Sequence, residues 1–163
     1  MGLQLPGELV EMLALIGLTW PEADEEKLFE LGQAWLELSP VLQTAAAQGG
    51  AAAEAVWSGN SGQAVEAFQR YWTEHGVPSA LDLSADGVRV LGVGLIVYAA
   101  IVLALKINVI VQLTILAVEI AQAVATAAPT FGASLLEIPV FQQLTRAVVE
   151  ELIWQVIGEI IGG

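Results

Sequence analysis

The chain has no cysteine and few basic residues, and these two absences exclude several classes of function. Without cysteine there is neither a disulfide nor a thiolate metal site. There are 5 Lys and Arg residues against 18 Asp and Glu residues, which gives a net charge of -13. Because Lys and Arg neutralise phosphate, we exclude nucleic acid as a partner. The same charge disfavours docking on anionic lipid.

Residues suited to catalysis are also scarce. His75 is the single histidine, and it lies at the predicted end of a helix, where the helix dipole favours a cation. The acidic residues do not recur at metal-ligand spacing. Gly92-Val93-Gly94 lacks the strand and the third glycine of a dinucleotide fingerprint. We therefore expect a protein that is not an enzyme, with no catalytic residue, cofactor or metal.

Apolar sequence with helical periodicity is what the chain has in excess. Hydrophobic residues make up 56% of it and charged residues 14%, and strict alternation is absent, so the fold class is predicted to be all-α. Residues 1–82 hold 12 of the acids, which either attract a basic partner or keep an apolar protein soluble. The predicted helices cover residues 7–17, 22–56, 62–75, 81–128 and 139 onwards.

The helix over 22–56 has the clearest pattern. A capping-box arrangement at Thr19–Glu22 predicts its start. Pro40 is expected to kink the helix without breaking it, and the small residues of 45–55 permit close approach of a second helix. Apolar residues at steps of three and four predict a heptad seam for hairpin packing. The seam consists of Leu28, Leu31, Trp35, Leu38, Leu42 and Ala45.

The stretch 90–118 has two interpretations. It is nearly long and apolar enough to span a bilayer, which takes about 20 residues. Lys106 divides it, and a central Lys costs roughly 2.5–3.5 kcal/mol on insertion. We favour a central bundle helix that other helices surround on every side, since such a position requires apolar residues all round. A membrane-active translocation or channel domain is the alternative.

Trp57-Ser58-Gly59 lies between two helical patterns, where the chain must reverse. Glycine at 59 allows the positive φ that ends a helix, and Trp57 can cover the open end of a bundle. A tryptophan at a helix junction is in most proteins only core packing. Here small residues precede it, and the following helix carries the aromatic residues Phe68, Tyr71 and Trp72. These three and Trp35 are the predicted hairpin-packing residues.

With these motifs, the chain resembles the WXG (Trp-x-Gly) superfamily of type VII secretion substrates. More closely, it resembles the N-terminal domain of the CpnT-like polymorphic toxins of actinobacteria. The likeness covers nearly the whole chain. It rests on the opening Leu5–Glu8, Thr19–Asp24, the Trp57–Gly59 turn, Phe68-x-x-Tyr71-Trp72 and the apolar region through Ser134. The resemblance implies an elongated helical bundle built on a WXG-type hairpin, with a long apolar central helix and a C-terminal helix. It also implies that Trp57 and Gly59 form the turn that the secretion machinery recognises.

The resemblance further implies a role in export. We expect a single domain over 1–163, with the first helix and the Trp-x-Gly hairpin in 1–78 and the long apolar and C-terminal helices in 79–163. It would be a piece of a longer protein with a toxin domain in cis. The expected partner is the type VII secretion ATPase or a small helical WXG-like protein, and the protein would be secreted or reach the cell surface. We expect no signal peptide for general secretion, because Glu8 and Glu11 interrupt the first apolar stretch.

The chain departs from the family in one respect. In the family's second export signal an acid follows a tyrosine by four residues, whereas His75 follows Tyr71 and Val102 follows Tyr98. That signal would lie in a partner protein or further along the chain. A third hypothesis is an adaptor that binds a basic partner through the acidic face of 22–37.

Overall fold

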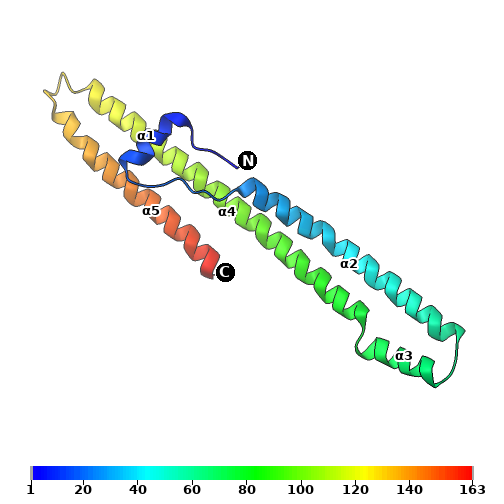
Figure 1. The fold of residues 1–163 in the computed structure, drawn as a ribbon. Coiled ribbons are helices and arrows are strands. Elements are labelled where there is room, and N and C mark those ends of the chain that lie inside the picture. The colour runs from blue at the N-terminus through cyan, green and yellow to red at the C-terminus, as the bar shows by residue number, and fades with distance from the viewer. Residues whose placement is uncertain (1, 163) are drawn as a thin grey trace. The chain divides into compact units, whose positions relative to one another are not determined.

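The computed structural model describes residues 2–162, most of which are helical, with no strand among them (Figure 1). The all-α fold class is confirmed, with a long central helix and a C-terminal helix. The predicted start of the last helix near Pro139 is also confirmed. The elements are α1 (Gly7–Leu15), α2 (Glu25–Gly59), α3 (Gln63–Glu74), α4 (Val77–Ala125), the 3-10 helix η1 (Ala133–Glu137) and α5 (Ile138–Gly162).

The described chain forms two compact units. Residues 2–27 and 98–162 make one, which we call the terminal unit, and residues 28–97 make the other, the hairpin unit. The helices α2 and α4 contribute residues to both. Each unit has its own packing and is described by itself.

The core of the terminal unit lies where α1 and α5 pack on α4. Gly17 follows the end of α1 with a φ of +70°, a conformation that glycine adopts readily and that turns the chain away from the helix axis. The core side chains recur at steps of three and four along α1 and α4, as expected for helices that bury one face. They are Leu9, Leu13, Ile16, Leu105, Val109, Leu113, Leu116 and Val149.

The helix α2 begins three residues later than the predicted capping box. Its first turn is capped by Asp24, whose carboxylate Oδ1 accepts the backbone N–H of Lys27 at 3.1 Å. This hydrogen bond holds the pKa of Asp24 below its ordinary value. Thr19–Glu22 belongs instead to a non-helical connection between α1 and α2. As predicted, α2 continues without a break through Pro40.

A buried ion pair anchors this connection to α4. The Lys106 ammonium is 2.7 Å from the Glu25 carboxylate and also donates to the carbonyl of Ala23 at 2.6 Å. Lys106 is 1% exposed and Glu25 is 7% exposed. The indole ring of Trp20 lies 5.8 Å from the ammonium, and the backbone N–H of Leu3 donates to the same carboxylate. The lysine that interrupts the apolar stretch thus ties the N-terminal segment to the centre of α4.

In the hairpin unit, α2 and α4 run antiparallel and meet through small residues (Figure 1). A Cβ added at Gly32 would lie 2.8 Å from the carbonyl oxygen of Gly92, and one at Gly92 would lie 2.8 Å from that of Gly32. The buried positions recur every seven residues. They are Gly32, Ser39, Ala46 and Ala53 on α2, and Ala85 and Gly92 on α4.

The predicted seam is therefore only partly right: Leu28, Trp35 and Leu42 are half-buried, but the line of closest contact lies on the small residues beside them. Leu31 is 48% exposed and Leu38 is 37% exposed, because they flank the contact line and do not lie on it. The distance between packed helices depends on the side chains at the contact, and only small residues allow backbones this close. The predicted close approach of a helix to the 45–55 segment agrees with the burial of Ala46 and Ala53.

The close approach predicts opposite effects for two glycines of the same helix. Gly92→Ala should lower the free energy of unfolding by roughly 1–3 kcal/mol, because the new methyl group meets backbone that cannot move aside. Gly94→Ala has open space around it and should raise the free energy of unfolding by up to about 1 kcal/mol. Urea unfolding of both variants measures the difference, and equal effects would contradict the close contact.

The ion pair predicts non-additive energetics. Glu25→Gln or Lys106→Met alone should each destabilise the protein by roughly 3–5 kcal/mol, since each strands a buried partner. The double variant should be much more stable than the sum of the two losses implies. A double-mutant cycle in urea measures the coupling. Additive losses would show that the two groups do not interact.

The same pair predicts a dependence on pH. Burial alone would raise the pKa of Glu25, but hydrogen bonds from Lys106 and Leu3 outweigh it and hold the pKa below its ordinary value of 4.5. Its contribution to stability is therefore complete above that pH and is lost as the pH falls through the lower folded-state pKa. Between about pH 5 and pH 3, stability should fall more steeply in the natural protein than in Glu25→Gln. Thermal unfolding over this range checks it.

Candidate interaction site at the aromatic end of the hairpin

Three aromatic rings gather where α2 meets α3. Trp57 lies in the last turn of α2, and its ring centroid is 5.9 Å from that of Phe68 on α3. One turn further along α3, the Trp72 ring is 5.7 Å from that of Phe68. Both pairs are tilted, a favourable geometry for aromatic contacts. We call these three residues the aromatic cluster.

The cluster also lies against α2. A Cβ added at Gly49 would be in ordinary contact with the Trp72 ring, at 3.9 Å. The apolar residues of α3 recur on one face, yet none of its residues is fully buried. The helix α3 is thus attached to the hairpin mainly by these rings.

The structure separates the predicted site residues. Trp57, Phe68 and Trp72 come together, whereas Tyr71 is 63% exposed and stacks on the ring of His75 at 4.9 Å. Trp35 is half-buried on α2, and 22 residues of helix place it about 33 Å from Trp57. It therefore packs elsewhere along the hairpin.

The predicted conformation of the turn is also corrected. Gly59 is the last residue of α2 and is helical, and the positive φ falls at Gly62, at +120°. The Asn60 side chain donates to the Val56 carbonyl at 2.8 Å and so satisfies one of the free carbonyls at the end of α2. The reversal of the chain takes place at residues 60–62, between the end of α2 and the start of α3. His75 is the C-cap residue of α3, as its predicted position implied.

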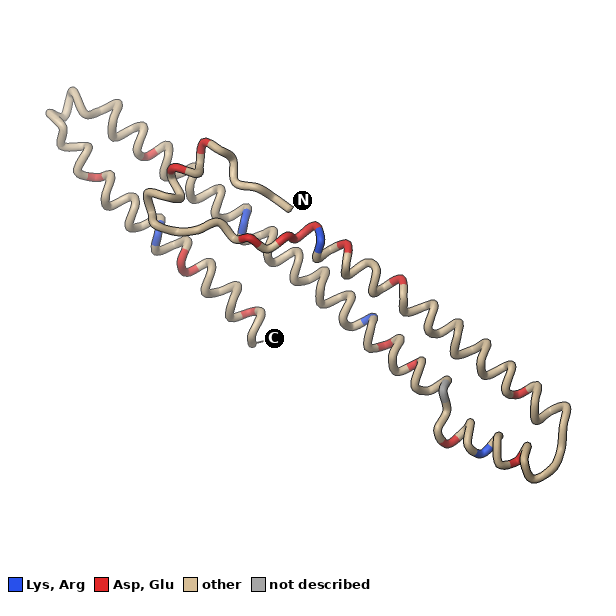
Figure 2. The backbone as a smooth tube through the Cα atoms, in the orientation of Figure 1, with Lys and Arg blue, Asp and Glu red and all other residues tan. Residues whose placement is uncertain are grey.

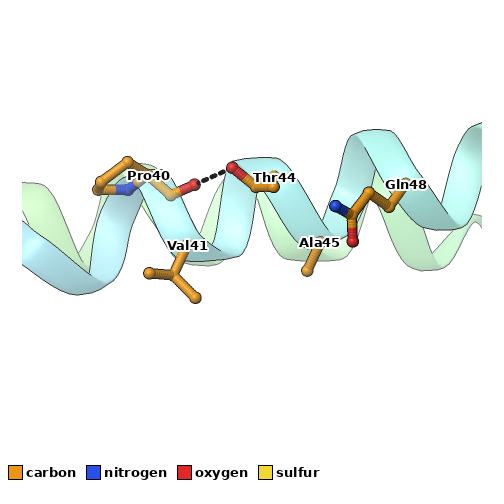
Figure 3. Close-up of a pocket in the computed structure, with 5 residues that line it drawn as sticks. All are labelled: Pro40, Val41, Thr44, Ala45 and Gln48. Carbon is orange, nitrogen blue, oxygen red and sulfur yellow. Dashed lines mark hydrogen bonds between the residues drawn. The ribbon is translucent and has the colours of Figure 1, made fainter.

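Large apolar side chains remain exposed on α2 and α4 of the hairpin unit. On α2, Val41 is 60% exposed and lines a shallow hollow with Pro40, Thr44, Ala45 and Gln48 (Figure 3). The Thr44 hydroxyl donates to the Pro40 carbonyl within this hollow. On α4, Val90 is 73% exposed. The small-residue contact therefore leaves the large residues available to another molecule.

The prediction that other helices surround α4 on every side is wrong. By length and composition, Gln63–Ala125 includes a helix apolar enough to cross a membrane, and only 28% of its most apolar window is buried. Within the terminal unit, one face of α4 packs on α1 and α5. The opposite face stays exposed and carries Ile107, Val111, Ile115 and Val118.

Two acids of the 22–37 face already have partners within the protein, which the sequence does not indicate. Glu25 is buried against Lys106, and Asp24 caps α2. In the part of the chain that the structure describes, His, Asp and Glu side chains form no group of three or more that could hold a metal ion.

Comparison with known families agrees with this fold. The family model of the WXG100-like domain matches residues 4–148, which is most of the chain. The chain belongs to this family and is a helical protein associated with type VII secretion. Proteins of the family are typically non-enzymatic and pair with helical partners. Neither the curated proteins nor the solved structures contain a significant match.

The aromatic cluster predicts a contrast between two residues of α3. Phe68→Ala removes the ring that contacts both tryptophans and should release α3 from α2, with faster amide exchange over 63–74. Its cost should be about 1–3 kcal/mol, the sum of two aromatic contacts. Tyr71→Ala is the matched control and should cost less than about 0.5 kcal/mol, because Tyr71 is exposed. Similar exchange in both variants would count against the cluster.

Proposed function

We propose that this chain is a non-catalytic export module at the N-terminal end of a larger type VII effector, such as a CpnT-like polymorphic toxin. It acts by docking, with the toxic activity carried further along the chain. Membership of the WXG100-like family supports the link to secretion. The proposal extends to one domain over residues 1–163 that is secreted or reaches the cell surface.

The exposed apolar faces of the hairpin carry this proposal. Leu31 and Val41 on α2, and Val90 and Val93 on α4, are each about half exposed or more. Full burial of an exposed side chain of this size is favourable by about 1.5–3 kcal/mol, so covering the part that remains exposed is favourable by roughly half to three quarters of that. A helical partner laid along the hairpin covers them in the way that helices cover one another within a bundle. A small WXG-like protein is therefore the proposed partner.

Trp57 and Gly59 are the proposed recognition residues for the secretion ATPase. They lie together at the end of α2, beside the other rings of the aromatic cluster. Because no acid stands four residues after Tyr71 or Tyr98, we propose that the small partner contributes the second export signal.

An export assay tests the recognition step. Trp57→Ala should reduce the exported protein at least tenfold while the helical circular dichroism of the purified variant is kept. Trp154→Ala is the matched control, since Trp154 is 68% exposed on α5 and lies in the terminal unit. Its export should be unchanged. Normal export of a folded Trp57→Ala variant would refute the role of this residue.

The docking step is tested separately, with a small helical WXG-like protein that binds the natural chain. The variant Leu38→Ser with Val41→Ser should lose the complex in size-exclusion chromatography with light scattering, because both side chains are exposed on the hairpin. Glu37→Gln should retain it. Retention of the complex by the serine variant would exclude this face as the interface.

A second candidate function is a membrane-active translocation or channel domain built on 90–118. The low burial of the apolar window of α4 favours it. Leakage of a dye from vesicles measures this activity, and intact vesicles at saturating protein would exclude it.

A further inference from the structure

The turn between α4 and α5 in the terminal unit presents an apolar side chain to solvent at a conformational cost. Phe131 has a φ of +50° and is the only non-glycine residue among 2–162 with a positive φ. It is also 99% exposed. A phenylalanine rarely adopts this backbone conformation, and such outliers persist at sites where they serve a function. Packing does not account for Phe131, because its side chain touches almost nothing.

The backbone of this turn is closed on itself by hydrogen bonds. The Gly132 N–H donates to the Ala127 carbonyl at 2.7 Å, and the Phe131 N–H donates to that of Ala128. Side-chain hydroxyls add further bonds, from Thr130 to the Thr126 carbonyl and from Ser134 to the Ala123 carbonyl, each at 2.7 Å. Amide groups paired in this way lose little when water is removed, which is the condition for entry into lipid.

The surface around Phe131 is apolar and lacks basic charge. Leu135 is 41% exposed and Leu136 is 77% exposed. Residues 120–136 contain no charged residue and are flanked by Glu119 and Glu137, and there is no Lys or Arg from 107 to 145. In Figure 2 the end of the α4–α5 hairpin is accordingly drawn in tan, without blue.

We propose that this turn is a membrane-docking finger that inserts Phe131 and Leu136 into the boundary between headgroups and acyl chains of an electrically neutral bilayer. The self-paired backbone meets the condition for entry into lipid, and the apolar residues on both sides of the turn give the tip an apolar surface broad enough to lie in the bilayer boundary. Without Lys or Arg, the finger gains nothing from anionic headgroups, and the two glutamates are repelled by them. Glu137 follows Leu136 directly and limits the depth of insertion.

This inference is independent of the export function and differs from the channel hypothesis, because the finger touches the membrane without crossing it. Binding without dye leakage distinguishes it from a channel. Export by the Trp57 end can fail or succeed without affecting it.

The absence of cysteine allows a direct test on the full chain. Ala133→Cys labelled with an environment-sensitive dye reports on the turn, and the same label at Gln155→Cys on α5 is the control. With vesicles of phosphatidylcholine alone, the label at 133 should brighten and shift to the blue, and the label at 155 should not. Adding 30% phosphatidylglycerol should weaken the response. Brightening that requires the anionic lipid, or occurs equally at 155, would overturn the proposal.

Variants separate docking from folding. Phe131→Asn should reduce binding to phosphatidylcholine vesicles about tenfold or more, as expected for loss of one buried aromatic ring. Asparagine tolerates a positive φ, so the melting temperature should stay the same or rise. Glu137→Gln should bind at least as tightly as the natural protein.

A residue on the exposed face of α4 provides the matched control. Val111→Ser lies outside the turn and should leave vesicle binding unchanged. An equal loss in Val111→Ser and Phe131→Asn would assign the contact to α4 and overturn the finger. Absence of binding by the natural protein to any of these vesicles would also overturn it, and would favour a protein pocket as the site that receives Phe131.

Discussion

The ion pair between Lys106 and Glu25 is the constraint on which the terminal unit depends. An ammonium group in the middle of a long apolar helix must find a partner or leave the core. It finds a carboxylate at the start of α2 and the carbonyl of Ala23, so the segment between α1 and α2 is held against α4. The polar residue that weakens a membrane-span interpretation is therefore the one that organises the packing.

The hairpin unit follows a different principle. Small residues every seven positions bring α2 and α4 together, with the backbones of Gly32 and Gly92 in contact. Close contact between narrow helix faces buries little of the larger side chains, and many of them stay in solvent. In the proposed function, a helical partner covers these exposed side chains, while the contact between α2 and α4 itself rests on the small residues.

Sequence reasoning found the aromatic end but misjudged its details. It grouped Trp57 with Phe68 and Trp72 because they flank one reversal of the chain, and the rings do meet. It included Tyr71, which lies one position before Trp72 and so points about 100° away around the helix. It placed the positive φ at Gly59, although Gly62 has it. Both glycines suit such a conformation, and only the length of α2 decides between them.

Sequence patterns alone predict the helical class and the approximate ends of most helices, because periodicity and turn residues act locally. Only the tertiary structure decided which face of each helix is buried. Large apolar residues at steps of three and four mark a broad stripe, and the line of closest contact within it depends on the partner helix. The pairing of Lys106 with Glu25, 81 positions apart, was likewise beyond any local pattern, since the fold alone brings those two charges together.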